Sequence, residues 1–438
     1  MKRYEKYKNS GVQWIGEVPS HWEIVPFKYY TDVIMGQSPN GEDIKSEGAT
    51  PFMQGNAEFG NIFPSTIYFC EACSKFSRIG DILMSVRAPV GEINLSDKVY
   101  GIGRGLCSIS AKHCNRQYLW YFLKKSKNDL NIYANGSTFT AITIQVLKSF
   151  KLILPPLPEQ QAIASFLDTK TKPIDDIIAK REKQIELLEE MKSAIISRAV
   201  TKGLNPEAQM KDSGIEWIKT KPHSWETRRI KNVITLLTDY DANGSFADIA
   251  KNVKVNVGEP YAWMVRATDL ANKRYGIVDD NNYCNKETFD FLSKSSLEAG
   301  DILIAKRGDI GKSYAVPKCD CPMTLAPNTY LLKTNKKVIS NRFFHYFFMS
   351  DYGKKQLSIN NKSTTIGAIY KDDVKNLKIL LPPMDEQQAI ASYLDTETSK
   401  IDIRIAKRRK QIELLQEYKQ TLITAAVTGK IDVREHIS

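Results

Sequence analysis

Apolar residues recur at helical spacing in two long segments of the chain, residues 157–202 and 384–428. Steps of three, four or seven residues separate them, which is the spacing of a coiled-coil seam. The seam positions are Ile174, Ile178, Ile185, Leu188, Ile195 and Ala199 in the first segment, and Ile401, Ile405, Ile412, Leu415, Leu422 and Ala426 in the second. The pattern predicts two long helices that pair as an antiparallel coiled coil.

Charged residues and a proline interrupt this pattern. Arg181 and Lys192 stand at seam positions in the first segment, and Arg408 and Lys419 stand at the matching positions in the second. Pro173 is expected either to end a short first helix or to kink a continuous one. The helix that follows it would have about 27 residues and a length of about 40 Å.

Shorter apolar stretches outside these segments indicate strands. Residues 81–86 and 301–305 are entered from glycine-containing turns, and residues 150–154 and 377–381 are each closed by a Pro-Pro pair. The predicted fold class is α+β, with two globular α/β domains separated by two long helices.

The chain also repeats itself. Residues 154–204 and 381–431 are identical at about 32 of 51 positions without a gap. Weaker matches upstream pair residues 10–15 with 213–218, Trp22 with Trp225, and the Gly-Asp-Ile-Leu stretches at 80–83 and 300–303. The predicted order is a globular domain at 1–155, a central helical spacer at 156–205, a second globular domain at 206–381 and a C-terminal helical spacer at 382–438. This arrangement is an internal pseudo-twofold repeat.

The contrast between the repeats carries information about function. Near-identical helical spacers offer two equivalent surfaces, which suits two copies of one partner. Dissimilar globular domains can recognise two different targets. A spacer of about 40 Å has the length of about 12 base pairs of DNA, so an antiparallel helix pair would let two domains read one duplex at two separated places.

The distribution of charge supports this interpretation. Lys and Arg number 62 and Asp and Glu number 50 among 438 residues, for a net charge of +12. The spacers are close to neutral, whereas the globular domains carry excesses of about 5 and about 7 positive charges. Basic domains on neutral spacers favour binding to the phosphate backbone of a nucleic acid, with ordinary solvated surface charge as the alternative.

The sequence contains no pattern typical of a membrane protein. Its apolar runs are far shorter than the roughly 20 residues that span a bilayer. The N-terminal residues are polar and rich in lysine, without the apolar region of a secretory signal. We therefore expect no membrane partner and a cytoplasmic location.

The helical motif and the tryptophan-containing opening resemble a known family. Residues 154–204, their copy at 381–431, and the pair SGVQWIGEVPSHW and SGIEWIKTKPHSW are similar to the DNA specificity subunit of type I restriction–modification systems. The resemblance covers essentially the whole chain and implies that the globular domains are target recognition domains. It implies a non-catalytic subunit that directs two methyltransferase subunits, and in the full complex two restriction–translocation subunits, to a bipartite, asymmetric site in double-stranded DNA.

The resemblance also implies which subunits hold the cofactors. S-adenosylmethionine, ATP and magnesium would belong to the partner subunits, with no cofactor on this chain. One alternative is a DNA-binding regulator or decoy with the same fold that acts outside a modification complex. Another is an independent DNA-modifying enzyme.

The residue patterns argue against catalysis by the chain itself. A methyltransferase of this kind needs an Asp/Asn-Pro-Pro-Tyr/Phe sequence, but both Pro-Pro pairs follow leucine and precede Leu157 or Met384. A glycine cluster at residues 101–105 is interpreted as a turn. The cysteine pairs Cys70–Cys73 and Cys319–Cys321 lack a second pair at the spacing of a structural zinc site. We expect no metal site.

Polar residues on predicted loops are the candidates for DNA contact, because such side chains recognise base edges and phosphates. The candidates for the first domain are Gln37, Ser38, Gln54, Asn56, Arg87, Ser137, Thr138, Lys148 and Lys151. Those for the second domain are Arg266, Thr268, Asp269, Arg307, Lys362, Ser363, Thr364, Thr365, Lys375 and Lys378.

Candidates that differ between the domains are better suited to reading sequence than candidates that recur. The candidates for reading bases are therefore Gln54 and Asn56 in the first domain, and Arg266 and Asp269 in the second. Arg87 and Arg307 recur, which suits phosphate contacts or a structural ion pair. The four lysines Lys148, Lys151, Lys375 and Lys378 are phosphate candidates or solvated residues. Trp14, Trp22, Trp217 and Trp225 are expected to pack in the core or at domain edges.

Overall fold

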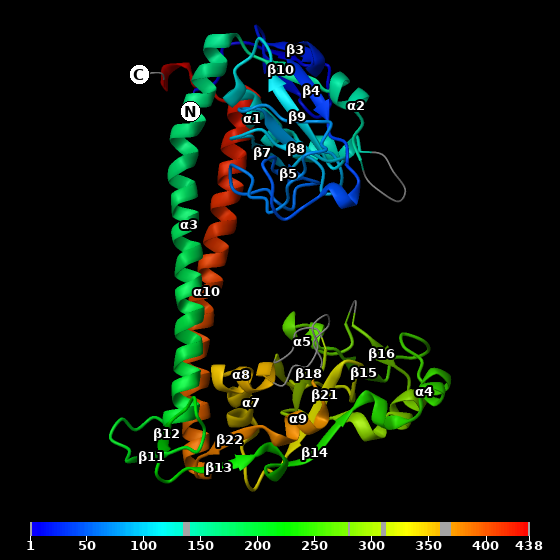
Figure 1. The fold of residues 1–438 in the computed structure, drawn as a ribbon, viewed down its shortest axis with the longest axis vertical. Coiled ribbons are helices and arrows are strands. Elements are labelled where there is room, and N and C mark those ends of the chain that lie inside the picture. Colours follow the sequence, from blue (N-terminus) through cyan, green and yellow to red (C-terminus); the bar gives the residue numbers. More distant parts are fainter. Residues whose placement is uncertain (1, 135–140, 279–280, 308–311, 360–368, 437–438) are drawn as a thin grey trace. The chain divides into compact units, whose positions relative to one another are not determined.

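The computed structural model describes residues 2–134, 141–278, 281–307, 312–359 and 369–436. The chain forms two compact units, of which unit 1 contains Met1–Glu182 and Arg409–Ser438, and unit 2 contains Lys183–Arg408 (Figure 1). Each unit combines one globular domain with a part of both long helices. The unit boundaries therefore fall inside the helices, whereas the sequence prediction placed its domain limits at the helix ends.

Unit 1 is built around a four-stranded antiparallel sheet with the strand order β4-β9-β6-β7. Strands β5 and β8 form a parallel pair, and β3 pairs with β10. The globular elements are β1 (Tyr7–Asn9), β2 (Glu17–Pro19), β3 (Glu23–Pro26), β4 (Thr31–Met35), β5 (Phe52–Met53), β6 (Ile82–Ser85), β7 (Ile93–Leu95), β8 (Gly101–Ile102), β9 (Leu106–Ala111), α1 (Arg116–Ile132), α2 (Ile144–Ser149) and β10 (Lys151–Leu154).

Unit 2 repeats this plan with a larger second sheet. Its sheets have the orders β14-β21-β18-β19 and β16-β15-β20-β17, and β13 pairs with β22. The globular elements are β11 (Met210–Asp212), β12 (Thr220–Pro222), β13 (Glu226–Arg229), β14 (Ile234–Asp239), α4 (Phe246–Asn252), β15 (Ala262–Val265), α5 (Ala267–Ala271), β16 (Tyr283–Cys284), α6 (Lys286–Phe291), β17 (Ser296–Leu297), β18 (Ile302–Ala305), β19 (Ser313–Ala315), β20 (Met323–Leu325), β21 (Thr329–Thr334), α7 (Asn341–Met349), α8 (Asp351–Ile359), α9 (Lys371–Asn376) and β22 (Lys378–Leu381). The four strands expected from sequence correspond to β6, β10, β18 and β22.

The two long helices are α3 (Leu157–Lys202) and α10 (Met384–Val427), with 46 and 44 residues. Pro173 lies inside α3, so the prediction that it ends a short first helix is wrong, and so is the estimate of about 27 residues. Proline removes one backbone hydrogen bond of a helix. Residues on both sides of it, such as Leu167 and Ile174, are buried, and this packing holds the helix together.

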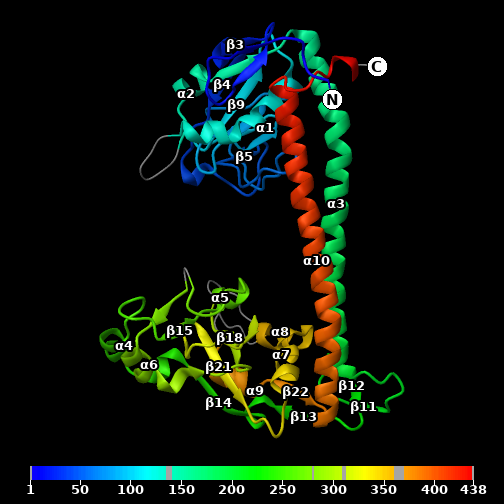
Figure 2. The ribbon, with the colours of Figure 1, turned by 180° about the vertical axis from the view of Figure 1, so that it is seen from behind.

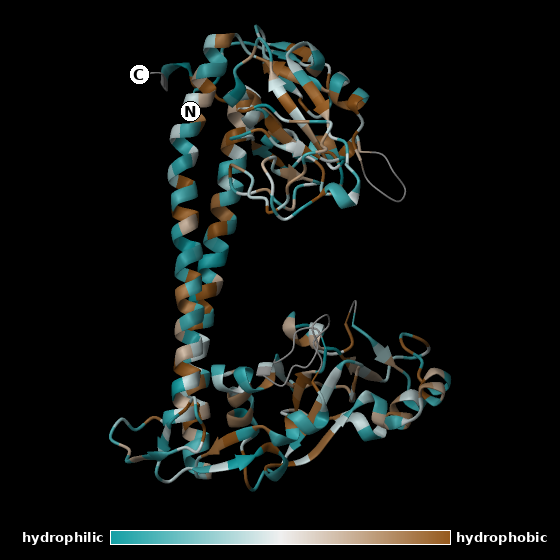
Figure 3. Ribbon diagram, in the orientation of Figure 1, coloured by the Kyte–Doolittle hydropathy of each residue, from teal (hydrophilic) through white to brown (hydrophobic). Residues whose placement is uncertain are grey.

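The two helices lie side by side within each unit (Figures 1 and 2). In unit 1, Ile163 belongs to one core cluster with Val427, and Asp175 pairs with Lys419 farther along, which is an antiparallel arrangement. In unit 2, Val200 shares a cluster with Ile390. All twelve predicted seam residues are buried or half-buried. Both helices are otherwise mainly hydrophilic (Figure 3), so burial follows the predicted seam.

The globular domains pack directly onto these helices. In unit 1, Tyr118 and Phe122 of α1 lie in one core cluster with Ile109 of β9 and Leu422 of α10. Asn115 is the N-cap of helix α1, and its side chain accepts a hydrogen bond from the Tyr118 amide. In unit 2, Phe344 of α7 packs in the cluster that contains the α10 residue Ile390. The core of each unit is therefore shared between its sheet and its helix pair.

Candidate nucleic-acid interface

Three strands of unit 1 meet at one end of its main sheet. Because β9 is antiparallel to both β4 and β6, the last residues of β4 and β6 lie beside the first residues of β9. The parallel pair β5 and β8 ends here as well, since the amide of Gly103 donates a hydrogen bond to Met53 O over 2.7 Å. Polar residues that follow these strand ends are therefore brought together.

Direct contacts join the predicted residues at this end. Gln54 Nε2 donates to Ser38 Oγ over 2.7 Å, and the same hydroxyl accepts from the Arg104 amide over 3.3 Å. Gln37 Oε1 accepts from Ser74 Oγ over 3.2 Å. Gln37, Ser38, Gln54, Arg87 and Arg104 define what we call the sheet-end surface of unit 1. These contacts bring the candidates Gln37 and Ser38 together with Gln54, which the sequence did not predict.

Arg104 was not predicted from the sequence as a contact residue. It belongs to the glycine cluster at residues 101–105, which the sequence suggested was only a turn. A Cβ on Gly36 would lie 2.1 Å from Gly103 O, and a Cβ on Gly103 would lie 2.4 Å from Gln54 Oε1. Side chains at these positions would separate the segments, so the glycines bring Arg104 to the surface beside Gln54.

The repeated Gly-Asp-Ile-Leu motif has a structural explanation at the other end of its strand. Asp81 accepts hydrogen bonds from the hydroxyls of Ser108 and Ser110, both over 2.5 Å. In unit 2, Asp301 accepts from the Glu298 amide over 2.9 Å, and burial raises the pKa of its carboxyl. The aspartate therefore anchors the strand at its start. Arg87 and Arg307 follow the opposite end, and both are exposed.

Unit 2 presents a different set of side chains at the corresponding end. Lys306 Nζ donates to Asp239 Oδ2 over 2.9 Å and to Asp241 Oδ2 over 2.7 Å, and Lys371 Nζ donates to Asp239 Oδ1 over 2.7 Å. Burial raises the pKa of Asp239, but the hydrogen bonds from Lys371 and Lys306 outweigh it, so that the pKa lies below its ordinary value. The cluster is charged at neutral pH.

The same backbone positions of unit 1 carry apolar residues. Met35 is opposite Cys107, the second residue of β9, and Asp239 is opposite Tyr330, the second residue of β21. Met35 and Asp239 therefore occupy the same position in the two sheets. The amide of Val86 bonds to the residue before β9, as the amide of Lys306 bonds to the residue before β21. A methionine and a valine thus stand where unit 2 has an ion pair. Met35 and Asp239 were missed in the sequence because the segments around them cannot be aligned without the strand register. Val86 and Lys306 were overlooked, although the repeated Gly-Asp-Ile-Leu motif places them at the same position.

Arg266 occupies the position in unit 2 that Gln54 occupies in unit 1. The amide of Ala326 donates to Val265 O as that of Gly103 donates to Met53 O. The Arg266 guanidinium binds the Asp269 carboxylate, with Nη2 to Oδ1 at 2.7 Å. Asp269 is 0% exposed, so the prediction that it contacts DNA is not supported, because a fully buried carboxylate holds the arginine and does not reach a ligand. Thr268 is exposed beside it.

We define the sheet-end surface of unit 2 by Asp241, Arg266, Thr268, Lys306 and Arg307. Asn56 occupies in unit 1 the position that Thr268 occupies in unit 2, and it is half-buried near Gln54. Six further predicted residues lie outside the described part of the chain, namely Ser137, Thr138, Lys362, Ser363, Thr364 and Thr365.

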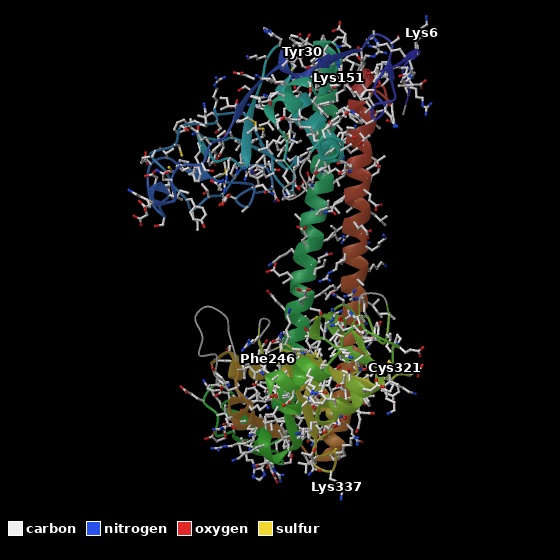
Figure 4. The ribbon with its side chains drawn as sticks, turned by 90° about the vertical axis from the view of Figure 1, so that its right-hand side faces the viewer. Lys6, Tyr30, Lys151, Phe246, Cys321 and Lys337 are labelled. Atoms are coloured by element: carbon white, nitrogen blue, oxygen red, sulfur yellow. The ribbon has the colours of Figure 1, made fainter. Side chains whose placement is uncertain are left out.

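The four predicted lysines are not at the sheet-end surfaces. Lys151 begins β10 opposite Pro26, near the start of β4, and Figure 4 labels it at the same end of unit 1 as Tyr30. Lys148 is exposed on the preceding helix α2. Lys375 pairs with Asp372 at 3.2 Å, and Lys378 begins β22 opposite Arg229. Lys151 and Lys378 therefore lie at the opposite end of the main strands from the sheet-end surfaces.

The tryptophan prediction is confirmed for one repeated pair. Trp22 and Trp225 are both 0% exposed. Trp14 is half-buried and stacks on Phe150, whereas Trp217 is largely exposed beneath Lys355. In the described ranges, no group of three or more His, Cys, Asp or Glu side chains is arranged to hold a metal ion. No described helix is long and apolar enough to cross a membrane.

The comparisons with known proteins identify the family. Residues 19–187 and 222–414 match the family model of the type I restriction modification DNA specificity domain. The chain belongs to this family. The two matches contain the two sheet-end surfaces, one in each unit.

Relatives with curated names are type I specificity subunits. The MjaVIII specificity subunit of Methanocaldococcus jannaschii is 27% identical, with 95% of this chain and 94% of the relative aligned. A candidate MjaX specificity subunit of the same organism is 40% identical over 192 residues, which is 44% of its length. The EcoBI specificity subunit of Escherichia coli is 22% identical over 75% of this chain and 69% of the relative. Membership agrees with the prediction that the chain is the specificity subunit and not the enzyme.

A solved structure shares the fold. A chain of a type I R-M system, solved in a study of complex assembly and conformational transition, is 16% identical and superposes with a TM-score of 0.65. The alignment covers 94% of this chain and 99% of that chain. The fold class predicted from the repeats is therefore confirmed, while supercoiling of the helices stays a prediction.

Proposed function

We propose that this type I specificity subunit recognises a bipartite, asymmetric site in double-stranded DNA, with one half-site bound by each unit. The observation that carries the proposal is the pair of sheet-end surfaces. Their backbone frames correspond, but Gln54 is replaced by Arg266, and Met35 and Val86 by Asp239 and Lys306. Corresponding frames with different donors and acceptors are suited to reading two different base sequences.

The proposal extends to the partner subunits. Leu187 and Met191 on α3 are 52% and 49% exposed, and Leu414 and Tyr418 at the equivalent positions on α10 are 51% and 55% exposed. Two equivalent apolar positions on hydrophilic helices support binding of two copies of one methyltransferase subunit. Restriction–translocation subunits would join this complex, with S-adenosylmethionine, ATP and magnesium bound by the partners. Residues 1–155 and 206–381 would be the target recognition domains, and the cytoplasm the site of action.

Methylome mapping of a host that expresses the chain with its methyltransferase tests this function. We expect methylation at one motif with two unlike halves separated by unspecified bases. A continuous or palindromic motif would contradict the two-surface proposal. A chain that binds such a site but no methyltransferase would be a regulator or decoy.

Exchanging one residue between the surfaces makes the test sharper. Arg266→Gln gives unit 2 the side chain that unit 1 has at this position, and Gln54→Arg is the reciprocal change. Each should alter the preference at one half-site and leave the other half-site as in the wild type, because a good bidentate contact discriminates bases by about 1–3 kcal/mol. A change in both halves from either substitution would count against one half-site for each unit.

A further inference from the structure

Unit 2 contains a basic hollow away from its sheet-end surface. The hollow has a volume of about 650 Å³ and is lined by Thr227, Arg228, Arg229, Lys231, Asn232 and Lys378. Thr227 and the two arginines belong to β13, Lys378 begins the paired strand β22, and Lys231 and Asn232 lie in the turn that follows β13. Four cationic side chains therefore surround one open depression.

The cations are held in place by few and weak contacts. Arg228 Nε donates to Glu226 Oε2 over 2.7 Å, in a pair whose side chains are 38% and 60% exposed. Arg229 Nη1 donates to Asn376 Oδ1 over 3.4 Å, and Lys378 Nζ donates to Gly214 O over 3.4 Å. Exposed pairs of this kind contribute little to stability and leave the cations available to an anion. Glu226 supplies one negative charge against the four positive ones.

The corresponding strand pair of unit 1 lacks the arginines. Pro26 stands opposite Lys151 as Arg229 stands opposite Lys378, so Val25 and Pro26 occupy the positions of Arg228 and Arg229. Lysine is present at the strand start in both units. The extra charge is therefore a property of unit 2 alone, although the local backbone is shared.

We propose that this hollow binds phosphate groups of the DNA backbone outside the half-site that unit 2 recognises. Arginine pairs with phosphate through two parallel hydrogen bonds, and clustered cations gain affinity by releasing counterions from DNA. The hollow lies at the start of strand β14, and the sheet-end surface lies at the end of the same strand. A six-residue strand is about 20 Å long, which equals about six base pairs. The proposal therefore requires the duplex to run along β14, so that phosphates about six base pairs from the recognised bases reach the hollow.

This inference rests on the proposed DNA-binding function, and the test separates the two. The full chain in complex with its methyltransferase is titrated with a duplex of the mapped site, either with long flanks or trimmed to the site, at a series of KCl concentrations. The test variant is Arg228→Val with Arg229→Gln. The control variant, Lys251→Gln with Lys294→Gln, removes the same charge from exposed positions elsewhere in unit 2.

The expected result is a smaller salt dependence for the test variant with the long duplex only. The slope of log K against log salt should fall by about 1 for each lost phosphate contact, with the methylated sequence unchanged. Arg228→Lys with Arg229→Lys should retain the wild-type slope. An unchanged slope, an equal loss in the control variant, a changed base preference or a lost methyltransferase would each overturn the proposal.

Free phosphate compounds are the other source of the same chemistry. Inorganic triphosphate is therefore titrated against the wild type and the test variant without DNA. Binding of triphosphate by the wild type alone, together with equal DNA slopes, would assign the hollow to a nucleotide and overturn the DNA assignment. If the wild type does not distinguish its site from a scrambled duplex, the proposed function fails, while the comparison of slopes remains a separate result.

Discussion

Two glutamates at the start of the long helices explain why the tryptophans recur in the sequence. Trp22 Nε1 donates to Glu159 Oε2 over 2.9 Å, and Trp225 Nε1 donates to Glu386 Oε2 over the same distance. Glu159 also accepts from the Tyr4 hydroxyl at 3.0 Å. Each indole therefore fastens the opening segment of a globular domain to the helix that leaves it.

Removing these carboxylates should destabilise the chain unequally. Glu159→Ala leaves the buried indole of Trp22 and the hydroxyl of Tyr4 without an acceptor, at a cost of about 1–3 kcal/mol for each unsatisfied group. Glu386→Ala removes the acceptor of Trp225 alone and should cost less. Thermal unfolding of both variants measures the order, with Glu159→Gln as the control that keeps one acceptor oxygen. A larger loss from Glu386→Ala would contradict this account.

A half-buried histidine predicts how the stability of unit 2 depends on pH. Burial and, to a smaller extent, the charge of Lys192 lower the pKa of His345 from 6.5 to about 4. Its Nδ1 is buried without a hydrogen-bond partner among the described residues. The unfolded chain therefore takes up a proton between pH 6.5 and pH 4 that the folded unit does not.

Stability of unit 2 should accordingly fall as the pH is lowered through this range. A shift of this size corresponds to a loss on the order of 3 kcal/mol. His345→Phe keeps an aromatic ring without the titrating group and should flatten the difference between urea unfolding at pH 7 and at pH 4.5. An unchanged pH dependence in the variant would show that other groups control it.

At the scale of elements, the helix pair is held by matching contacts in both units. Lys192 Nζ lies 2.6 Å from Asp402 Oδ1 in unit 2, and Lys419 Nζ lies 2.5 Å from Asp175 Oδ1 in unit 1. These lysines are two of the four charged residues that interrupted the seam pattern in the sequence. They stand at the edge of the buried seam and extend to an aspartate of the opposite helix, which is why a charge is tolerated there.

Neighbouring leucines on the same helices should respond differently to the same substitution. Leu188 and Leu415 are half-buried in the seam, so Leu188→Asp with Leu415→Asp places unpaired charge there and should cost on the order of 2–4 kcal/mol. Leu187→Asp with Leu414→Asp changes exposed residues and should shift stability by less than about 0.5 kcal/mol. Urea unfolding distinguishes the pairs, and equal losses would show that the seam is misassigned.

Binding of the methyltransferase should also distinguish these variants, because the exposed leucines affect the partner and not the stability of the chain. Under the proposed function, the exposed pair contributes to the partner surface. Leu187→Asp with Leu414→Asp should therefore weaken co-purification of the methyltransferase while the chain stays folded. Full retention of the partner would remove these leucines from the proposed surface.

Helical periodicity was enough to predict the long elements, because their seam recurs over many turns. At Pro173 the sequence left two alternatives open, an end of the helix or a continuous helix with a kink, and the structure contains a continuous helix. The sheet-end surfaces could be predicted only in part. Gln54 and Arg266 were found as polar residues after apolar stretches. Arg104 depends on close glycine contacts and Asp239 on strand register, which a single sequence does not reveal, whereas Lys306 was overlooked beside the repeated Arg307.

At the scale of the whole molecule, the division of charge gains a physical location. The excess positive charge belongs to the globular domains, and in unit 2 part of it surrounds the basic hollow formed by Arg228, Arg229, Lys231 and Lys378. In contrast, Lys306 and Lys371 at the sheet-end surface are paired with Asp239. Within unit 2, some cationic side chains therefore line the hollow and others are paired with an aspartate. A count of charged residues does not distinguish these two groups.

Lengthening both helices tests the proposed role of the spacers. Seven residues inserted between Glu182 and Lys183, and seven between Arg408 and Arg409, retain the phase of the seam and add about 10 Å to each helix. Methylome mapping should then find the same half-site sequences separated by about three more base pairs. An insertion in one helix alone should disrupt the pairing and abolish methylation. Altered half-site sequences would contradict the role of the helices as spacers.

Because unit 1 is made of two separate chain segments, it also determines the order in which the molecule can fold during synthesis. Unit 2 is one continuous stretch, Lys183–Arg408, whereas unit 1 is completed by residues that are synthesised after unit 2. Leu422 and Val427 belong to the same apolar cluster as Trp22 and Phe122. Until they emerge, the first domain to be made keeps part of its core uncovered while the second can already be complete. The nascent first domain is therefore expected to expose apolar surface until the rest of unit 1 is synthesised.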